Sequence, residues 1–260
     1  MNRRSCSIFA GLCALALSSL CTLPANAQNS EVKAKPPMYS YVANWQIPRA
    51  HWGEMAKSSD ADKAILDKAL ADGTIVAYGN DENYVHTPDG YTHDDWWSSM
   101  SMAGLLNVLD QFYSSGNVDS PALEAATKHS DEIVVSRYYN WHSGSYKDAP
   151  LSVAIYQLKP DAPDDAVEML SKTLVVPLME KLLADGTIAE YEIDTQAIHT
   201  DEPGIFAIVW IPVNNAAVDK VNAALRTAMA EQPLGGPAFL SMIDYSKHRD
   251  ELWRGSGVYK

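Results

Sequence analysis

An internal repeat is the feature of this sequence that most restricts its fold. Residues 68–78 read KALADGTIVAY and residues 181–191 read KLLADGTIAEY, so the segments share six consecutive identities at an offset of 113 positions. A His-Thr pair follows each segment at that same offset, as His86-Thr87 and His199-Thr200. A helix end that runs into a strand explains one Ala-Asp-Gly-Thr match, but not two matched elements at one constant offset. The repeat therefore predicts two copies of one structural unit.

The second copy has the clearer signals for helices and strands. β-branched and aromatic residues predict strands at 151–158, 187–198, 205–213 and 238–245. A helix is predicted to begin near Asp161 and to break at Pro177, which lacks the amide that a helical hydrogen bond needs. Gly186 ends the second piece of that helix as a left-handed cap. Asn214 or Asn215 caps a further helix.

The first copy follows the same order with weaker signals. Ser58-Ser59 occupies the position of Pro177, so the first helix is expected to be broken in this copy as well. The predicted helices are 49–57, 60–71 and 100–113, and the predicted strands are 39–47, 74–86, 91–98 and 132–139.

The order β-α-β-β-α-β, present twice, is that of the ferredoxin-like unit. Two helices cover one face of such a sheet and leave the other face bare. A tandem copy can cover that bare face. The predicted fold class is therefore α+β, with two tandem ferredoxin-like βαββαβ repeats packed sheet to sheet as an intramolecular α+β barrel.

This arrangement resembles the dimeric α+β barrel superfamily in a fused form. That superfamily includes the antibiotic-biosynthesis monooxygenase, EthD, NIPSNAP and chlorite-dismutase-like families. The resemblance covers nearly the whole mature chain and rests on the order and repetition of elements. No catalytic motif of any one family is present, so no family residue is transferred to this sequence.

The first residues have the pattern of a signal peptide. Arg3 and Arg4 precede an apolar run at 8–20, and Ala25 and Ala27 supply the small residues of a cleavage site. The predicted organisation is a signal peptide at 1–27, a linker at 28–37, a first repeat at 38–146, a second repeat at 147–253 and a C-terminal tail at 254–260. We expect a periplasmic or secreted protein without a membrane anchor. Its intact mass after export should correspond to a chain that begins at Gln28.

Removal of the signal peptide limits the kinds of catalysis and binding that the mature chain can perform. All three cysteines lie within the signal peptide, so the mature chain has no thiol for catalysis or for metal binding. The mature chain keeps 18 basic and 33 acidic residues, a net charge of −15, which should repel nucleic acid and anionic lipid. The expected partner is a small-molecule ligand. The chain is expected to be a monomer or a homodimer, because fusion already supplies the pairing of the two sheets.

Common catalytic signatures are missing from the sequence. It has no Gly-rich phosphate loop, no His-Glu-x-x-His, no nucleophile elbow and no EF-hand loop. The copies differ instead in aromatic content, because five of the seven tryptophans and five of the seven histidines lie in the first copy. The hypothesis is an aromatic ligand pocket lined mainly by the first copy. Its candidate ligand-binding residues are Trp45, Tyr78, Trp96, Trp97 and Trp141; the alternative is that these side chains only pack the interior.

His86 and His93 are the candidate catalytic residues. Alternation in a strand over 74–86 places His86 on the face of Tyr78 and predicts that both point into the barrel. A neutral imidazole there can act as a general base or as an axial ligand of haem iron. The repetition of His86 as His199 favours a structural role for this pair.

The run that contains His93 is polar where the second copy is apolar. In a strand, His93 and Asp95 share one face and Asp94 shares the other with Trp96. A His/Asp pair can orient a base or contribute to a metal site. No third ligand is identifiable, so no metal site is predicted.

Three classes of function stay open. The first is an exported protein that binds a small apolar or aromatic ligand in the first-copy pocket. The second is a monooxygenase-like enzyme of the α+β barrel type that uses little or no cofactor, or haem. The third is a packed scaffold that acts through its surface.

Overall fold

The structure is a computed structural model that describes residues 32–116, 120–231 and 236–260. The predicted signal peptide and residues 28–31 of the predicted linker lie outside the described residues. The described part of the linker lies against β4 (Lys128–Trp141). There the Lys35 amide donates to the Arg137 carbonyl at 2.8 Å, and the Tyr139 hydroxyl donates to the Pro36 carbonyl at 3.0 Å.

Both halves of the chain run through strands and helices in a similar order. The first half contains β1 (Met38–Gln46), a 3₁₀ turn (Arg49–His51), α1 (Trp52–Asp72), β2 (Ala77–Asn83), β3 (His93–Ser99), α2 (Met102–Ser115), α3 (Pro121–Glu124) and β4. The second half contains β5 (Gly144–Gln157), α4 (Ala166–Leu170), α5 (Val176–Ala184), β6 (Ile188–Gln196), β7 (Ile205–Pro212), α6 (Asn215–Glu231), α7 (Gly236–Met242), a 3₁₀ turn (Tyr245–Lys247) and β8 (Arg249–Tyr259).

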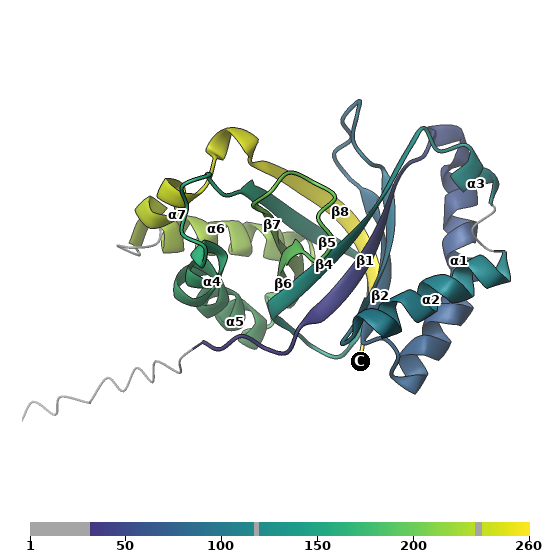
Figure 1. Ribbon diagram of the computed structural model, residues 1–260, viewed down its shortest axis with the longest axis horizontal. Coiled ribbons are helices and arrows are strands. Elements are labelled where there is room, and N and C mark those ends of the chain that lie inside the picture. The colour runs from purple at the N-terminus through teal and green to yellow at the C-terminus, as the bar shows by residue number, and fades with distance from the viewer. Residues whose placement is uncertain (1–31, 117–119, 232–235) are drawn as a thin grey trace, which may run out of the picture. The chain divides into compact units, whose positions relative to one another are not determined.

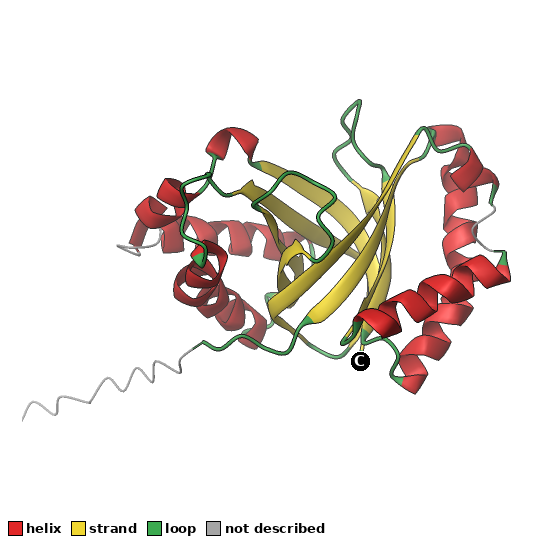
Figure 2. Cartoon of the chain, in the orientation of Figure 1, coloured by secondary structure: helices red, strands yellow, loops and turns green. Residues whose placement is uncertain are grey.

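Eight antiparallel strands of the described residues close into a barrel in the order β1-β3-β2-β8-β5-β7-β6-β4. Strands of the first half lie side by side as β4-β1-β3-β2, and those of the second half as β8-β5-β7-β6. Pairing of β2 with β8 and of β4 with β6 joins the halves. The helices form two groups outside the barrel, α1–α3 against one half and α4–α7 against the other (Figures 1 and 2). The mixed α+β barrel predicted from the sequence is therefore present.

The repeated Asp-Gly-Thr segment performs the same local task in both halves. Gly73 and Gly186 adopt left-handed backbone angles, with φ of 82° and 73°, directly after a helix. The preceding aspartate then accepts a hydrogen bond from the threonine amide two residues later, at 3.0 Å for both Asp72 and Asp185. Glycine is favoured at such a position because it lacks a Cβ. The repeat thus encodes a helix end and a turn into a strand.

The predicted helix break is confirmed in the second half only. Residues Ser171–Val175 form a π-helical turn just before Pro177, where the chain lacks an amide hydrogen. In the first half the predicted break at Ser58-Ser59 is wrong, because α1 is continuous. Serine keeps its backbone amide, and the Ser59 hydroxyl donates to the Met55 carbonyl one turn earlier at 3.3 Å. A serine pair therefore does not reproduce the effect of proline.

The end of the chain also differs from the prediction. The segment predicted as a strand at 238–245 is largely helix α7, and the last strand is β8. Residues 254–260, predicted as a tail, supply most of the pairing of β8 with β2. Gly255 and Gly257 lower the predicted strand propensity of this segment, because glycine is uncommon in strands. They are glycines because a Cβ at Gly255 would meet Asp81, and one at Gly257 would lie 2.7 Å from the Tyr146 hydroxyl.

Hydrophobic cores lie between the helices and the outer faces of the strands. In the first half, Leu105 and Val108 of α2 pack against Trp97. In the second half, Met179 of α5 and Val221 of α6 pack in the corresponding layer. In the described part of the chain, no helix combines the length and apolar character needed to cross a membrane.

A matched pair of Gly-to-Ala changes tests the packing at the inner face of β2. A Cβ at Gly79 would lie 2.6 Å from both the Ser256 carbonyl oxygen and a Trp96 ring carbon. We expect Gly79→Ala to lower the free energy of unfolding by about 1–3 kcal/mol through overpacking. Gly53 of α1 has open space around its Cα, so Gly53→Ala should leave stability unchanged or raise it by up to about 1 kcal/mol. Urea denaturation measures both, and equal stabilities of the two variants would contradict the described packing.

Candidate functional site

A cavity of about 590 Å³ lies between α1 and the sheet of the first half, and we call it the α1 cavity. Its walls include Trp52, Ser59 and Lys63 of α1 together with Tyr78 of β2, His93 and Asp95 of β3. The start of β5 and the end of β8 complete it through residues such as Tyr146 and Arg254. The volume is ample for a ligand of one or two rings.

His93 and Asp95 point to the same side of β3, as the strand alternation predicts. The His93 ring lies edge-on to Trp52 with centroids 5.4 Å apart, and the Ser59 hydroxyl donates to the Asp95 carboxyl at 3.0 Å. Asp94 and Trp96 face the inside of the barrel, where the Trp96 indole N–H donates to Asp81 at 3.0 Å. This alternation places a histidine and a carboxyl group together on the helix side.

Burial changes the protonation of both groups. Desolvation lowers the pKa of His93, an effect that the nearby Glu82 carboxylate opposes, so the imidazole is held towards its neutral form. Desolvation raises the pKa of Asp95 to about 7, helped by the charges of Asp62 and Asp81 and opposed by the Ser59 hydrogen bond. The site therefore combines a neutral imidazole that can accept a proton with a carboxyl group whose pKa lies near neutral pH.

Tyr78 is held in a polar network on the wall of the cavity. Its hydroxyl donates to Asp67 at 2.5 Å and accepts from Lys63 at 3.0 Å. Lys63 in turn contacts Asp67 at 2.7 Å one helical turn away. Burial is the main cause that raises the pKa of Tyr78, so the phenol stays neutral and presents a fixed polar atom to the cavity.

The predicted orientation of His86 is wrong. β2 ends at Asn83, whose side-chain oxygen accepts a hydrogen bond from the Val85 amide at 2.8 Å and turns the chain out of the strand. His86 lies in the following loop, with its ring centroid 5.1 Å from that of Trp52. Tyr78 faces α1 rather than the barrel, because the inner positions of β2 are small residues, Ala77 and Gly79, packed close to Trp96.

The structure separates the predicted ligand-binding residues. Tyr78 and His93 line the α1 cavity, with His86 near Trp52 beside it. Trp96 lies inside the barrel, and Trp97 lies in the helix-side core with its indole N–H donating to Leu105. Trp45 stacks on His129 with centroids 3.6 Å apart, and Trp141 stacks on Tyr139 at 5.5 Å. None of these four tryptophans lines the α1 cavity.

A second cavity, which we call the α6 cavity, occupies the corresponding place in the second half. It measures about 560 Å³ and lies between α5, α6 and α7 and the strands β5 and β7. Its walls are mainly apolar and aromatic, with Tyr156, Trp210 and Phe239 among them. His248 stacks on Tyr156 with ring centroids 4.3 Å apart. This cavity was not predicted, because the aromatic residues pointed to the first copy and the apolar run 205–213 was the signal for it in the second.

A third cavity lies inside the barrel, and we call it the barrel cavity. It measures about 160 Å³, and both apolar and carboxyl side chains line it. Its acidic residues were not predicted from the sequence. The signal for two of them, Glu192 and Asp194, was their period-two spacing in the predicted strand 187–198, which puts both side chains on one face.

No group of three or more His, Cys, Asp or Glu side chains in the described ranges is arranged to hold a metal ion. The His93/Asp95 pair is thus not joined by a third ligand within that part of the chain.

Comparison with known proteins relates this chain to others through its structure. No protein-family model matches the sequence, and no curated protein matches it. A putative monooxygenase from Lactobacillus acidophilus NCFM has a TM-score of 0.61 at 13% identity, covering 85% of this chain and 94% of the other. A second one, from Fusobacterium nucleatum, has a TM-score of 0.57 at 7% identity, with 87% and 95% covered. An anthrone oxidase-like protein has a TM-score of 0.51 at 9% identity, with 86% and 93% covered. At these identities the likeness establishes the α+β barrel fold alone.

The raised pKa of Asp95 predicts a pH dependence of stability. Because the folded-state pKa of about 7 lies above the ordinary 3.8, the folded protein favours the neutral carboxyl. The resulting stability is fully present below about pH 4 and is lost as the pH rises through 7. Asp95→Asn removes this loss. We expect the stability of the variant relative to the parent to rise by about 2–4 kcal/mol between pH 4 and pH 8, reduced from the full linkage value by partial solvent access.

Chemical denaturation at several pH values measures this difference. Asp164→Asn, a change of the same charge at an exposed position, serves as the control and should run parallel to the parent. Parallel profiles for Asp95→Asn and the parent would contradict the raised pKa.

Proposed function

We propose that this protein binds a small hydroxylated aromatic molecule in the α1 cavity. The observation that carries the proposal is the joint placement of His93 and Asp95 on one face of β3, beside Trp52 and Tyr78, in a cavity of about 590 Å³. Trp52 offers a ring edge and face for stacking. The imidazole and the carboxyl group offer acceptors for a phenolic hydroxyl.

A second candidate function is enzymatic, namely proton abstraction from such a ligand followed by its reaction with O₂. Two observations favour it. The lowered pKa of His93 leaves the imidazole able to accept a phenolic proton. The fold is also shared by two putative monooxygenases and an anthrone oxidase-like protein, although the shared fold alone does not carry the reaction. The phenolate formed would be the electron-rich species that reacts with O₂.

Haem, the cofactor raised by the resemblance, does not fit the residues of these cavities well. Haem carries two propionates, while the carboxyl groups of Asp81, Asp94 and Asp95 border the α1 cavity. Two of the three basic side chains that line it are already paired, Lys63 with Asp67 and Arg254 with Glu82. In the α6 cavity, His248 is held by the Ile155 carbonyl at 3.0 Å through Nδ1, and its Nε2 faces Asp250 at 3.4 Å. No step is therefore derived through haem.

We also infer that the two halves are ferredoxin-like repeats that arose by duplication. The strand orders β4-β1-β3-β2 and β8-β5-β7-β6 support this, since they correspond position by position. The shared Asp-Gly-Thr helix ends support it independently. An experimental structure tests the inference, and halves that fail to superimpose over their strands would contradict it.

Substitution of His93 separates binding from turnover. With 1-naphthol and anthrone as probes, calorimetry measures binding and an oxygen electrode measures turnover. We expect His93→Gln to keep binding within a few-fold while any O₂ consumption falls about 10²–10⁴-fold, the usual contribution of a general base. His51→Gln is the control, because His51 is exposed and paired with Glu54 outside the cavity.

The ligand proposal and the catalytic role of His93 can be contradicted separately. Absence of probe binding to the parent protein would contradict the ligand proposal. Binding with unchanged O₂ consumption in His93→Gln would contradict the role of His93 as a base and leave the ligand proposal intact.

A further inference from the structure

The floor of the α6 cavity consists of small side chains with larger ones on both sides. Ser152 and Ala154 of β5 form this floor. Their partners across the sheet are larger, namely Trp210 and Ile208 of β7 on one side and Leu252 and Asp250 of β8 on the other. Directly paired residues of neighbouring strands project from the same face of a sheet. The two small residues therefore leave a recess in the sheet, with an indole ring beside it.

Aliphatic and aromatic side chains of the helices cover this recess. The opposite wall includes Leu178 of α5, Leu225 of α6 and Phe239 of α7. Tyr156 of β5 is held between two other rings, edge-on to Phe239 with centroids 4.9 Å apart and stacked on His248 at 4.3 Å. A space between a sheet floor and a helical roof, with fixed rings in its wall, suits a flat apolar molecule.

Three large apolar side chains that line the cavity are also exposed to solvent. Val85 is 61% exposed, Leu240 50% and Tyr245 67%. They come from three separate segments, namely the loop after β2, helix α7 and the 3₁₀ turn that follows it. Single exposed apolar residues are ordinary, but a group of them around one apolar cavity is typical of a ligand-binding groove. This exposed rim points to an occupant independently of the cavity volume.

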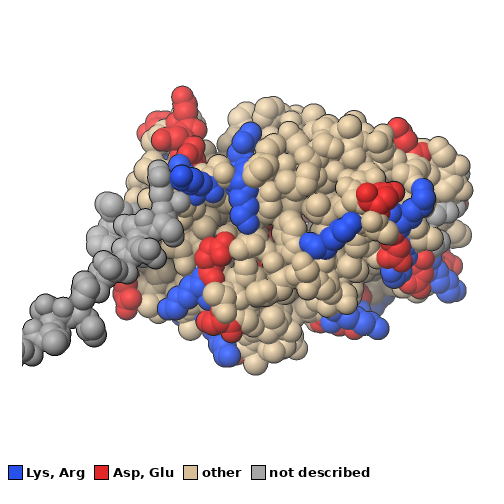
Figure 3. Space-filling model, turned by 90° about the horizontal axis from the view of Figure 1, so that it is seen from below, with Lys and Arg blue, Asp and Glu red and all other residues tan. Residues whose placement is uncertain are grey.

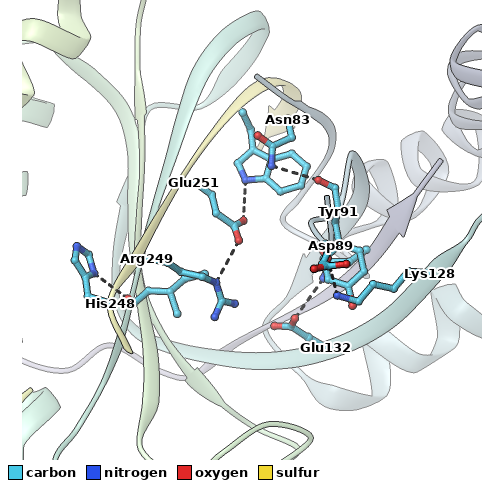
Figure 4. A network of polar contacts seen from close by, with 11 residues as sticks. Asn83, Asp89, Tyr91, Lys128, Glu132, His248, Arg249 and Glu251 are labelled. Carbon is cyan, nitrogen blue, oxygen red and sulfur yellow. Dashed lines mark hydrogen bonds and ion pairs between the residues drawn. The ribbon is translucent and has the colours of Figure 1, made fainter. Parts of the chain in front are cut away.

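The charges around the cavity exclude an anionic ligand. On the face of the molecule seen in Figure 3, Lys and Arg side chains lie among the acidic ones, but no Lys or Arg belongs to the described residues that line this cavity. Figure 4 shows the Arg249 guanidinium on the other side of β8 from His248, where its Nε lies 3.4 Å from Glu251. Asp250 adds a carboxylate to the cavity wall, 3.4 Å from His248. An anion buried here would meet a carboxylate without a Lys or Arg to pair with.

We propose that the α6 cavity binds a neutral apolar molecule of about two to four rings, which lies flat on Ser152 and Ala154 beside Trp210. The cavity volume of about 560 Å³ lies within the range of about 300–1,000 Å³ that is usual for ligand pockets. It is also well above the roughly 150 Å³ that accommodates benzene in an engineered protein core. The described linings of the α6 and α1 cavities share no residue, so the proposal does not depend on the ligand of the α1 cavity.

Other occupants of the cavity fit less well. A fatty acid or another long-chain carboxylate would bring its negative charge towards Asp250. An extended polypeptide that adds to a sheet needs an unpaired strand edge, but β5 is already paired with β7 on one side and with β8 on the other. A neutral ring system requires neither a cation nor a free strand edge, because burial of its apolar surface supplies the affinity.

Two fluorescent probes with the same ring skeleton test the proposal on the full mature chain. N-phenyl-1-naphthylamine is neutral, whereas 1-anilinonaphthalene-8-sulfonate carries an added sulfonate group, and both fluoresce more strongly in an apolar site. We expect the neutral probe to bind at pH 7.5 at least about tenfold more tightly than the sulfonated one, because burial of an unpaired anion is unfavourable.

Substitutions that fill the cavity locate the bound probe. Ala228→Phe adds a ring from α6, and Ser152→Phe adds one from the floor, where a strand accommodates phenylalanine readily. Each should weaken binding of the neutral probe at least about tenfold, because the added ring occupies its space. The control Ala223→Phe makes the same change at an exposed position of α6 that does not line the cavity, and it should bind as the parent does.

Three other outcomes overturn the proposal. Equal or tighter binding of the sulfonated probe would contradict the preference for a neutral ligand. Unchanged binding of the neutral probe by a filled variant that circular dichroism shows to be folded would place the probe outside the α6 cavity. The two filled variants alter opposite walls, so one that does not fold leaves the other to decide, and the comparison of probes on the parent needs neither. A parent protein that binds neither probe would assign the exposed rim to a polypeptide instead.

Discussion

Closure of the barrel is the constraint on which the rest of this structure depends. Each half of the chain builds strands whose outer face is covered by its own helices, and the inner faces can be covered only by each other. Hydrogen bonding of β2 to β8 and of β4 to β6 supplies that cover and leaves no unpaired strand edge among the described strands. The last strand, β8, is therefore as necessary to the fold as the core helices.

Closure also divides the molecule into two chemical environments. Outside the strands, helices enclose the α1 and α6 cavities, of about 590 and 560 Å³. Inside, a smaller cavity brings together carboxyl groups that are far apart in sequence. Consecutive residues of β3 face the two environments in turn. His93 and Asp95 face α1, while Asp94 and Trp96 face the interior. One strand therefore contributes side chains to both environments.

The sequence predicted those features that local chemistry determines. The Asp-Gly-Thr turns, the helix break before Pro177 and the alternation of His93 to Trp96 all follow from backbone rules that operate within a few residues. Features that depend on distant partners were not predictable. The bulk of Trp96 requires a small residue at Gly79 on the inner face of β2. Asp81 and Tyr146 likewise leave no room for a side chain at the glycines of β8. The carboxyl groups of the interior become neighbours only when the barrel closes.

Closure of the barrel holds carboxyl groups in its interior away from water. Side-chain ¹³C NMR of protein labelled at aspartate carboxyl carbons measures this directly, by following each resonance from pH 3 to pH 9. We expect Asp81 to titrate near pH 7 and Asp94 to titrate well above its ordinary range, because burial disfavours the carboxylate. Titration of both groups near pH 4, as in water, would show instead that the interior is open to solvent.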